Sequence, residues 1–115
     1  MADCLIDSDV LIDHMRGARA LTRQQGSHYS TVTRCELFAG RYVAESDIRE
    51  LLGGFIELEV TREIAEAAGR LRRNSHMTTP DALIAATAVE YSLTLITRNL
   101  RDFASVPGLN VRSPA

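Results

Sequence analysis

The chain has 115 residues, of which 45% are hydrophobic and 24% are charged, and its formal net charge is −2. This composition is typical of a globular protein, and we expect a single domain over residues 1–115 that buries a core without disulfide bonds. The slight acidity argues against a broadly basic surface that binds nucleic acid by charge alone. All thirteen basic residues are arginine, which excludes any mechanism that needs a lysine.

The N-terminal segment combines a short strand with acidic residues. Residues 3–7 (DCLID) form an apolar run that predicts a buried strand, and helical pieces are expected over 9–15 and 17–24, with a break at Gly17. The acids stand where a signal peptide has a basic start. No apolar run approaches the roughly 18 residues that span a membrane. We therefore expect a cytoplasmic protein without membrane contact.

The middle of the chain alternates extended and helical patterns. A brief extended piece is expected at 28–30, followed by a helix within 31–43, where apolar residues recur at helical spacing. Both cysteines, Cys4 and Cys35, stand among apolar residues, and we expect them to be buried and reduced. Three further elements are expected: a helix over 46–54 capped by Ser46, a strand over 55–60, and a helix over 61–73 capped by Thr61.

The C-terminal part contains the most apolar helix of the chain. Residues 80–91 are apolar on nearly all sides, which predicts a buried helix. Strands are expected over 93–97 and 109–113, with a single helical turn at 98–103 between them. The alternation of strands and helices predicts a three-layer α/β/α sandwich with a mainly parallel central sheet. In such sheets ligands bind at the carboxyl ends of the strands, near the switch in strand order.

Five polar side chains lie where the predicted strands end or the predicted helices begin. Each also has a structural explanation: Glu36 fits a capping box with Thr33, Asp81 fits the first turn of a helix, and the other three fit helix caps. Asp9 either reaches the site as an outer group or caps the helix behind the first strand, and of the two we expect the cap. Because the carboxyl ends of parallel strands share one edge, the five are expected to converge. They are Asp7, Glu36, Asp81, Asn99 and Asp102.

Converging carboxylates indicate a particular chemistry. They repel one another and raise each other's pKa unless a cation compensates. The set offers oxygen ligands with no cysteine or histidine nearby, which favours a hard divalent cation, Mg²⁺ or Mn²⁺. Such sites bind phosphate groups and activate water for phosphodiester hydrolysis. The three histidines show no ligand or triad spacing, and the motifs of nucleotide-binding loops and of acyl-transfer enzymes are absent from the sequence.

Three segments resemble PIN-domain ribonucleases, and more narrowly the VapC-type toxins of toxin–antitoxin pairs. LIDSDVLID (5–13) resembles the opening strand of that family with its first acid, and STVTRCELFAG (30–40) resembles its second acidic segment. PDALIAATAVEYSLTLITRNLRDF (80–103) is the most specific of the three. It resembles the family's third acid, its small-residue helix and its T-R-N-x-x-D-F ending. The resemblance covers nearly the whole chain and implies a PIN-like fold.

The resemblance also implies an activity and roles for single residues. It implies a Mg²⁺- or Mn²⁺-dependent endoribonuclease that acts as the toxin of a type II pair and inhibits translation or growth. Asp7 and Asp81 would be metal ligands, and Glu36 would be a further ligand or position the attacking water. The fourth acidic position of the family falls on the neutral Asn99. Asn99 and Asp102 therefore stay joint candidates for the fourth partner.

RNA, an antitoxin and a second copy of the chain in a homodimer are the partners that the resemblance implies. Arginines near the predicted edge are candidates to hold RNA, although solvated helix faces explain them equally well. They are Arg16, Arg34, Arg98 and Arg101. Antitoxins of this family bind a groove near the active site, for which the candidate residues here are Met15, Leu21 and Tyr42.

Other classes of protein share parts of this pattern. Asp7 and Asp9 fit the Asp-x-Asp pair of haloacid-dehalogenase-type phosphatases, and an acidic pocket fits a response-regulator receiver domain. Both classes need a lysine, which this chain lacks. The remaining alternative is a catalytically weakened PIN-like module that binds RNA or protein, with the neutral Asn99 as its sign. Metal-dependent cleavage of RNA separates that module from the active nuclease.

Overall fold

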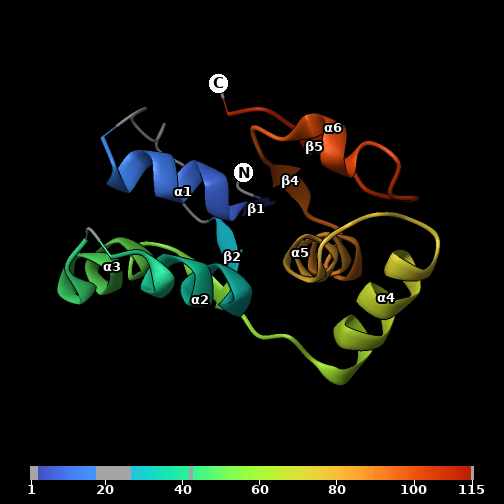
Figure 1. Cartoon of the computed structure of the whole chain (residues 1–115), viewed down its shortest axis with the longest axis horizontal. Helices are drawn as coiled ribbons and strands as arrows, with labels where there is room; N and C mark the ends of the chain where they lie inside the picture. The colour runs from blue at the N-terminus through green and yellow to red at the C-terminus, as the bar shows by residue number, and fades with distance from the viewer. Residues whose placement is uncertain (1–2, 18–26, 42, 115) are drawn as a thin grey trace.

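The computed structural model describes residues 3–17, 27–41 and 43–114 and consists of a five-stranded sheet with helices on both faces (Figure 1). The strands are β1 (Cys4–Ile6), β2 (His28–Ser30), β3 (Ile56–Leu58), β4 (Thr94–Ile96) and β5 (Val111–Arg112). The helices are α1 (Ser8–Met15), α2 (Thr31–Ala39), α3 (Glu45–Leu52), α4 (Arg62–Arg73), α5 (Thr79–Glu90) and α6 (Leu100–Phe103). Every element predicted within the described residues is present, most of the strands being shorter than predicted.

All five strands of the sheet run parallel, in the order β3-β2-β1-β4-β5. The chain moves outward from β1 through β2 to β3, and then crosses back to β4 and β5 on the other side of β1. The switch in strand order therefore lies between β1 and β4, which pair with Leu5 opposite Leu95 and Ile6 opposite Ile96. The predicted parallel sheet is confirmed. Folds of this kind bind ligands at the carboxyl ends of the strands that flank such a switch.

Alternating side chains of the central strands build a core on each face of the sheet. Cys4 and Ile6 of β1 and Ile96 of β4 are buried in the cluster that includes residues of α1, α2 and α3. Leu5 and Leu95 belong to a second cluster, with residues of α5 and α6. Helices cover both faces of a parallel sheet in this way. The predicted three-layer sandwich is therefore confirmed.

Helix α4 packs on α5. Ile64 and Ala68 of α4 are buried together with Ala82 and Ala86 of α5, and Figure 1 shows α4 beside α5 on the side away from α1 and α2. Helix α5 thus contacts the sheet on one side and α4 on another. This position explains why its sequence is apolar on nearly all sides.

The first residues of α4 and α2 test two of the helix caps predicted from the sequence. Thr61 caps α4 through its side chain, as predicted. Helix α2 is capped by Ser30, whose Oγ accepts a hydrogen bond from the backbone N–H of Val32. The predicted capping box of Thr33 and Glu36 is therefore wrong, because the helix begins earlier than that box requires.

Two further predictions about single residues are wrong. Helix α3 begins at Glu45 after Ala44, which makes no side-chain cap, so Ser46 is not the predicted cap. Cys35 is exposed, whereas Cys4 is buried as predicted. The buried positions of α2 lie two residues before and two residues after Cys35. Positions two apart on a helix point in nearly opposite directions, which places Cys35 on the outer side.

Some predictions fall on residues that the structure does not describe. Leu21 and Tyr42, predicted to contact an antitoxin, and most of the predicted helical piece over 17–24 lie outside the described residues. Gly17 itself has a φ of 72°, which suits glycine, and α1 ends just before it. Within the described ranges, no helix is long and apolar enough to cross a membrane.

Candidate active site

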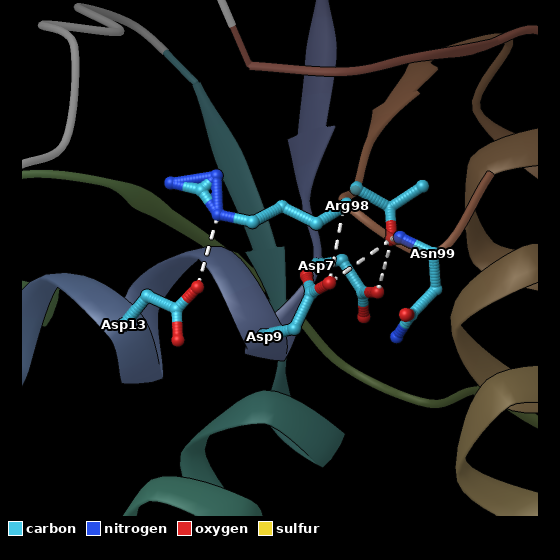
Figure 2. A network of polar contacts seen from close by, with 6 residues as sticks. Asp7, Asp9, Asp13, Arg98 and Asn99 are labelled. Carbon is cyan, nitrogen blue, oxygen red and sulfur yellow. Dashed lines mark hydrogen bonds and ion pairs between the residues drawn. The ribbon is translucent and has the colours of Figure 1, made fainter. Parts of the chain in front are cut away.

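Asp7 lies at the carboxyl end of β1, where the strand order switches, and is only 3% exposed. Its Oδ1 accepts a hydrogen bond of 2.8 Å from the backbone N–H of Ser8. Its Oδ2 accepts one of 2.7 Å from Thr97 Oγ1, drawn as a dashed line in Figure 2. The backbone N–H of Asp7 donates to the carbonyl oxygen of Ile96 at 2.9 Å. Hydrogen bonds from α1 and from the end of β4 thus fix the residue at the switch point.

The carboxyl group of Asp7 has a pKa of about 7, well above its ordinary value of 3.8. Burial is the largest cause, because it disfavours the charged form, and the carboxylate of Asp9 raises the pKa further. Hydrogen bonds from Thr97 and Ser8 lower the pKa, and Asp81 adds a smaller increase. A cation bound beside Asp7 would favour the charged form and lower this pKa again.

Asp9 connects α1 to the segment that follows β4. Its Oδ2 accepts a hydrogen bond of 3.0 Å from the backbone N–H of Arg98 and a longer one of 3.5 Å from Thr97 Oγ1. The N-cap of α1 is Asp7, so the predicted helix cap at Asp9 is wrong. Its Oδ1 is buried and has no hydrogen-bond partner in the described part of the chain. A buried carboxylate oxygen of this kind is costly unless a cation or an ordered water binds it.

Glu36 on α2 is oriented by two hydroxyl groups. Ser8 Oγ donates a hydrogen bond to Glu36 Oε1 and lies 2.9 Å from Thr33 Oγ1. Ser8 and Thr33 are both buried, so this network joins the starts of α1 and α2. Because Ser30 already caps α2, Thr33 and Glu36 are available to bond across to α1.

Asp81 lies in the first turn of α5, which begins at the same edge of the sheet. Burial raises the pKa of Asp81, and the carboxylates of Asp102, Glu36 and Asp9 raise it further. Asp81 and Asp102 line a common hollow of about 240 Å³. The structure thus brings Asp7, Glu36 and Asp102 into electrostatic range of Asp81, and Asp9 acts on both Asp7 and Asp81.

Asn99 precedes α6, but its side chain makes no cap hydrogen bond. The residue is exposed, and its backbone N–H donates to Thr97 Oγ1 at 3.0 Å. Asp102, one helical turn further, acts on the pKa of Asp81 through its charge. The negative charge on this side of the site therefore comes from Asp102, whereas the roles of both residues stay predictions.

The oxygen atoms at this edge fit a hard divalent cation in their chemistry. Among residues 3–17, 27–41 and 43–114, no three Asp, Glu, His or Cys side chains are grouped closely enough to hold a metal ion by themselves. Mg²⁺ commonly takes one or two carboxylates and completes its shell with waters and substrate phosphate oxygens. Asp9 has an Oδ1 without a partner among the described residues, and Asp7 has a raised pKa. A cation bound beside these two carboxylates would lower the free energy of their charged forms in the folded protein.

The four arginines predicted to hold RNA differ in their contacts. Arg98 Nε lies 3.0 Å from Asp13 Oδ2, so this guanidinium is directed at α1 (Figure 2). Arg34 Nε lies 2.6 Å from Glu57 Oε1. A phosphate bound by either guanidinium would therefore share it with a carboxylate or displace that carboxylate. The other two, Arg16 and Arg101, are exposed.

Thr97 and Ser8 are site residues that sequence reasoning missed. Both have hydroxyl groups that donate hydrogen bonds to the acids, Thr97 to Asp7 and Ser8 to Glu36. Their positions in the sequence could have indicated them. Thr97 directly follows β4, and Ser8 directly follows Asp7 at the end of β1, and these two strands flank the switch point.

Comparison with known proteins agrees with this geometry. Residues 4–109 match the PIN domain family. The chain belongs to the PIN domain family. Ribonuclease VapC19 of Mycobacterium tuberculosis is 36% identical to this PIN domain, over 91% of this chain and 95% of the relative. Ribonuclease VapC10 of the same species is 39% identical, over 86% of this chain and 84% of the relative.

Solved structures also resemble this PIN domain. A toxin–antitoxin complex from Klebsiella pneumoniae contains a chain with a TM-score of 0.79 and 34% sequence identity, covering 97% of this chain and 98% of that one. The DNA-bound VapBC of Salmonella typhimurium gives a TM-score of 0.82 at 18% identity, with both chains covered completely. At that identity the second likeness concerns the fold alone.

Proposed function

We propose that this PIN domain is a Mg²⁺- or Mn²⁺-dependent endoribonuclease and the toxin of a type II toxin–antitoxin pair. The observation that carries the proposal is the gathering of carboxylates around the buried Asp7 at the switch point of the sheet. Similarity to two VapC ribonucleases supports RNA as the substrate. Similarity to a toxin–antitoxin complex supports an antitoxin as the partner.

In this proposal some residues of the site bind the cation, and others orient the groups that react. Asp7 and Asp81 would hold the cation, with the buried Oδ1 of Asp9 as a further oxygen. When bound, the cation would neutralise the attacked phosphate and lower the pKa of a water molecule. Glu36, oriented by Ser8, would position the attacking water.

Proton release from Asp7 would accompany activation of the site. With a pKa of about 7, this carboxyl group is partly protonated at neutral pH in the absence of a cation. A metal ligand must be deprotonated, so the affinity for the cation would rise with pH through this range. The hydrogen bond from Thr97 keeps the carboxylate oriented in both states.

RNA cleavage would inhibit translation or growth, and the antitoxin would prevent it by binding near the acids. Met15 and Glu36 line a hollow of about 80 Å³ between α1, α2 and α3. A helix or strand of the antitoxin bound in this hollow would reach Glu36 directly. The homodimer stays a prediction.

A binding module that has lost the chemistry is the second candidate. Two observations favour it: Asn99 is neutral where the family has an acid, and the described residues contain no ready-made group of three metal-binding side chains. Such a module would bind RNA and leave it intact.

The proposal is tested by incubating the purified protein with total cellular RNA in Mg²⁺, Mn²⁺ or EDTA. We expect discrete products with either cation and none with EDTA. Asp7→Asn keeps the shape of the side chain and removes its charge, and it should slow cleavage at least about a hundredfold. Asp3→Asn is the matched control, because Asp3 is exposed just before the same strand.

The opposite outcomes separate the two candidates. Cleavage that persists in EDTA, or in Asp7→Asn at the wild-type rate, would contradict the assigned site. RNA binding without cleavage under any condition would favour the binding module.

A further inference from the structure

A cavity of about 430 Å³ lies between α4, α5 and the loop that joins α6 to β5. Cavities of about 300–1,000 Å³ with apolar walls and a few polar groups are typical of sites for small organic groups. The walls here are formed mainly by apolar side chains, among them Leu71, Met77, Ala86 and Val106. Polar, exposed side chains stand at its rim: Arg70, Asn74 and Glu90.

This cavity adjoins the hollow beside Asp81 and Asp102. The hollow that contains Asp81 and Asp102 is lined in part by the same residues as the larger cavity, namely Ser75, Met77 and Ser105. A chain molecule whose phosphate lies at the acids therefore has the larger cavity within reach of its next residues, on the other side of these shared side chains. Neither hollow is filled by another described segment of the protein.

Arginines without an ion pair to any described side chain stand at the end of α4 beside the cavity, and one of them, Arg70, lines it. Arg70, Arg72 and Arg73 stand together in the last turn of α4. Within the described residues, none of the three forms an ion pair, and Arg72 Nε donates to the Met77 carbonyl oxygen at 3.1 Å. In a protein of net charge −2, this cluster is a local site of attraction for an anion.

We propose that this cavity binds one nucleotide of the RNA that flanks the cleaved bond. The base lies between the apolar walls, and its phosphate meets Arg70 at the rim, with Arg73 in the same last turn of α4. This assignment rests on the proposed function, because it takes the scissile phosphate to lie at the acids. It adds a base-binding subsite on α4 and α5, far along the chain from the first acid.

The chemistry of the cavity favours a nucleotide over an apolar peptide segment. A base has an apolar π face that packs against side chains such as Met77 and Leu71, and polar edges that Asn74 and Glu90 can hydrogen-bond. A phosphate carries the negative charge that would compensate the unpaired arginines. An apolar helix from a partner would fill the walls but leave these arginines uncompensated.

The experiment measures binding with cleavage switched off. Asp7→Asn protein in EDTA is titrated with a mixed-sequence single-stranded RNA pentamer, and the methyl resonances of Met77 and Val106 are followed by NMR. We expect both to shift. Ala67→Leu, which fills the cavity from α4, should weaken binding about tenfold. Ala65→Leu on the exposed side of the same helix is the matched control and should bind like the parent protein.

Two further variants test the walls and the charge separately. Val89→Phe narrows the cavity from α5 at a position that is 40% exposed, so it gives the same comparison if Ala67→Leu does not fold. Arg70→Gln should weaken RNA binding. It should also reduce the slope of the logarithm of the binding constant against the logarithm of the salt concentration by about one. Arg62→Gln, at the other end of α4, is its control.

The outcomes distinguish this proposal from the function on which it rests. Methyl resonances that do not move, or cavity variants that bind RNA like the parent, would overturn the subsite even if the wild type cleaves RNA. Localised methyl shifts in a protein that never cleaves RNA would overturn the nuclease and keep the subsite. A changed oligomeric state in Ala67→Leu with unchanged RNA affinity would assign the cavity to a second copy and overturn the proposal.

Discussion

The two sides of the acidic site are built in different ways. On the β1 side, Asp7 is 3% exposed and is held by hydrogen bonds from Ser8 and Thr97. On the α5 side, Asp81 is partly buried and Asp102 is exposed, and both line an open hollow. One side therefore has fixed geometry, and the other is accessible to a large substrate.

The difference shows how a small domain combines a rigidly held carboxylate with a site that is open to a large substrate. A buried carboxylate keeps its position because neighbouring groups restrict it, but burial also raises its pKa and destabilises its charged form. An exposed carboxylate has little such cost and little orientation. We therefore expect substitutions on the β1 side to have large effects on stability, cation binding and cleavage, and substitutions on the α5 side to have smaller effects.

The largest expected effect is on the pH dependence of stability. Because the pKa of Asp7 is raised from 3.8 to about 7 in the folded protein, its folded form binds a proton more tightly than its unfolded form. The contribution of Asp7 to the free energy of unfolding of the metal-free protein should therefore be fully present below about pH 4 and be lost as the pH rises to 7. The expected loss is a few kcal/mol, about 1.4 kcal/mol per pH unit.

Urea unfolding between pH 4 and pH 7.5 measures this loss. Asp7→Asn should remove most of the slope and make the metal-free protein more stable at pH 7.5. Asp47→Asn, on the exposed side of α3, should keep the wild-type slope. Parallel curves for the wild type and Asp7→Asn would contradict the buried, proton-binding state of Asp7.

Metal binding should produce the next largest effect. At pH 8, where Asp7 is mostly ionised, Mg²⁺ at ten times its dissociation constant should stabilise the wild type by about 1.4 kcal/mol. Asp7→Asn should lose this stabilisation, and Asp3→Asn should keep it. Thermal unfolding with and without MgCl₂ and EDTA makes the measurement, and equal stabilisation of all three proteins would place the cation elsewhere.

Loss of the hydrogen bond from Thr97 should have an intermediate effect. Thr97→Val removes a donor that lowers the pKa of Asp7, so this pKa should rise further and cleavage at neutral pH should fall about tenfold. Thr97→Ser keeps the hydroxyl group and should restore the activity. Thr94→Val changes the same residue type at the start of β4, the strand that ends just before Thr97, and is the control. Equal rates for Thr97→Val and Thr94→Val would show that the hydroxyl has no positioning role.

The smallest effects are expected on the open side of the site. Asp102→Asn should weaken Mg²⁺ binding roughly threefold, the scale of an exposed charge interaction, because its charge acts on Asp81. Asn99→Ala removes a side chain that makes no cap hydrogen bond and should change the affinity less. Isothermal titration with Mg²⁺ compares the two variants. The reverse order would identify Asn99 as the fourth partner.

Much of the fold could be predicted because it depends on local periodicity. The alternating strands and helices, the Thr61 cap and the buried helix α5 follow from patterns that neighbouring residues contain. The predicted caps at Thr33 and Ser46 were wrong because several nearby residues can cap a helix, and packing decides where the helix begins.

The acidic site could be predicted in part. That Asp7, Glu36 and Asp81 meet follows from the geometry of a parallel sheet, since each stands at a strand end or a helix start. Whether Asp9 reaches the site or caps a helix could not be decided from the sequence, because its partner is the backbone N–H of Arg98, 89 residues away. A pairing over that distance depends on the exact register of β1 and β4, which residue spacing does not contain.

The sequence by itself determined the order of strands and helices, the parallel sheet and the acidic edge, because these depend on hydrophobic period and on which residues end each strand. Only the tertiary structure decided which oxygen atoms are buried, which are hydrogen-bonded and which arginines remain unpaired. Burial and hydrogen bonding are properties of packed neighbours, and those neighbours come from distant parts of the chain. The raised pKa of Asp7 and the cavity beside α4 therefore exist only in the folded protein.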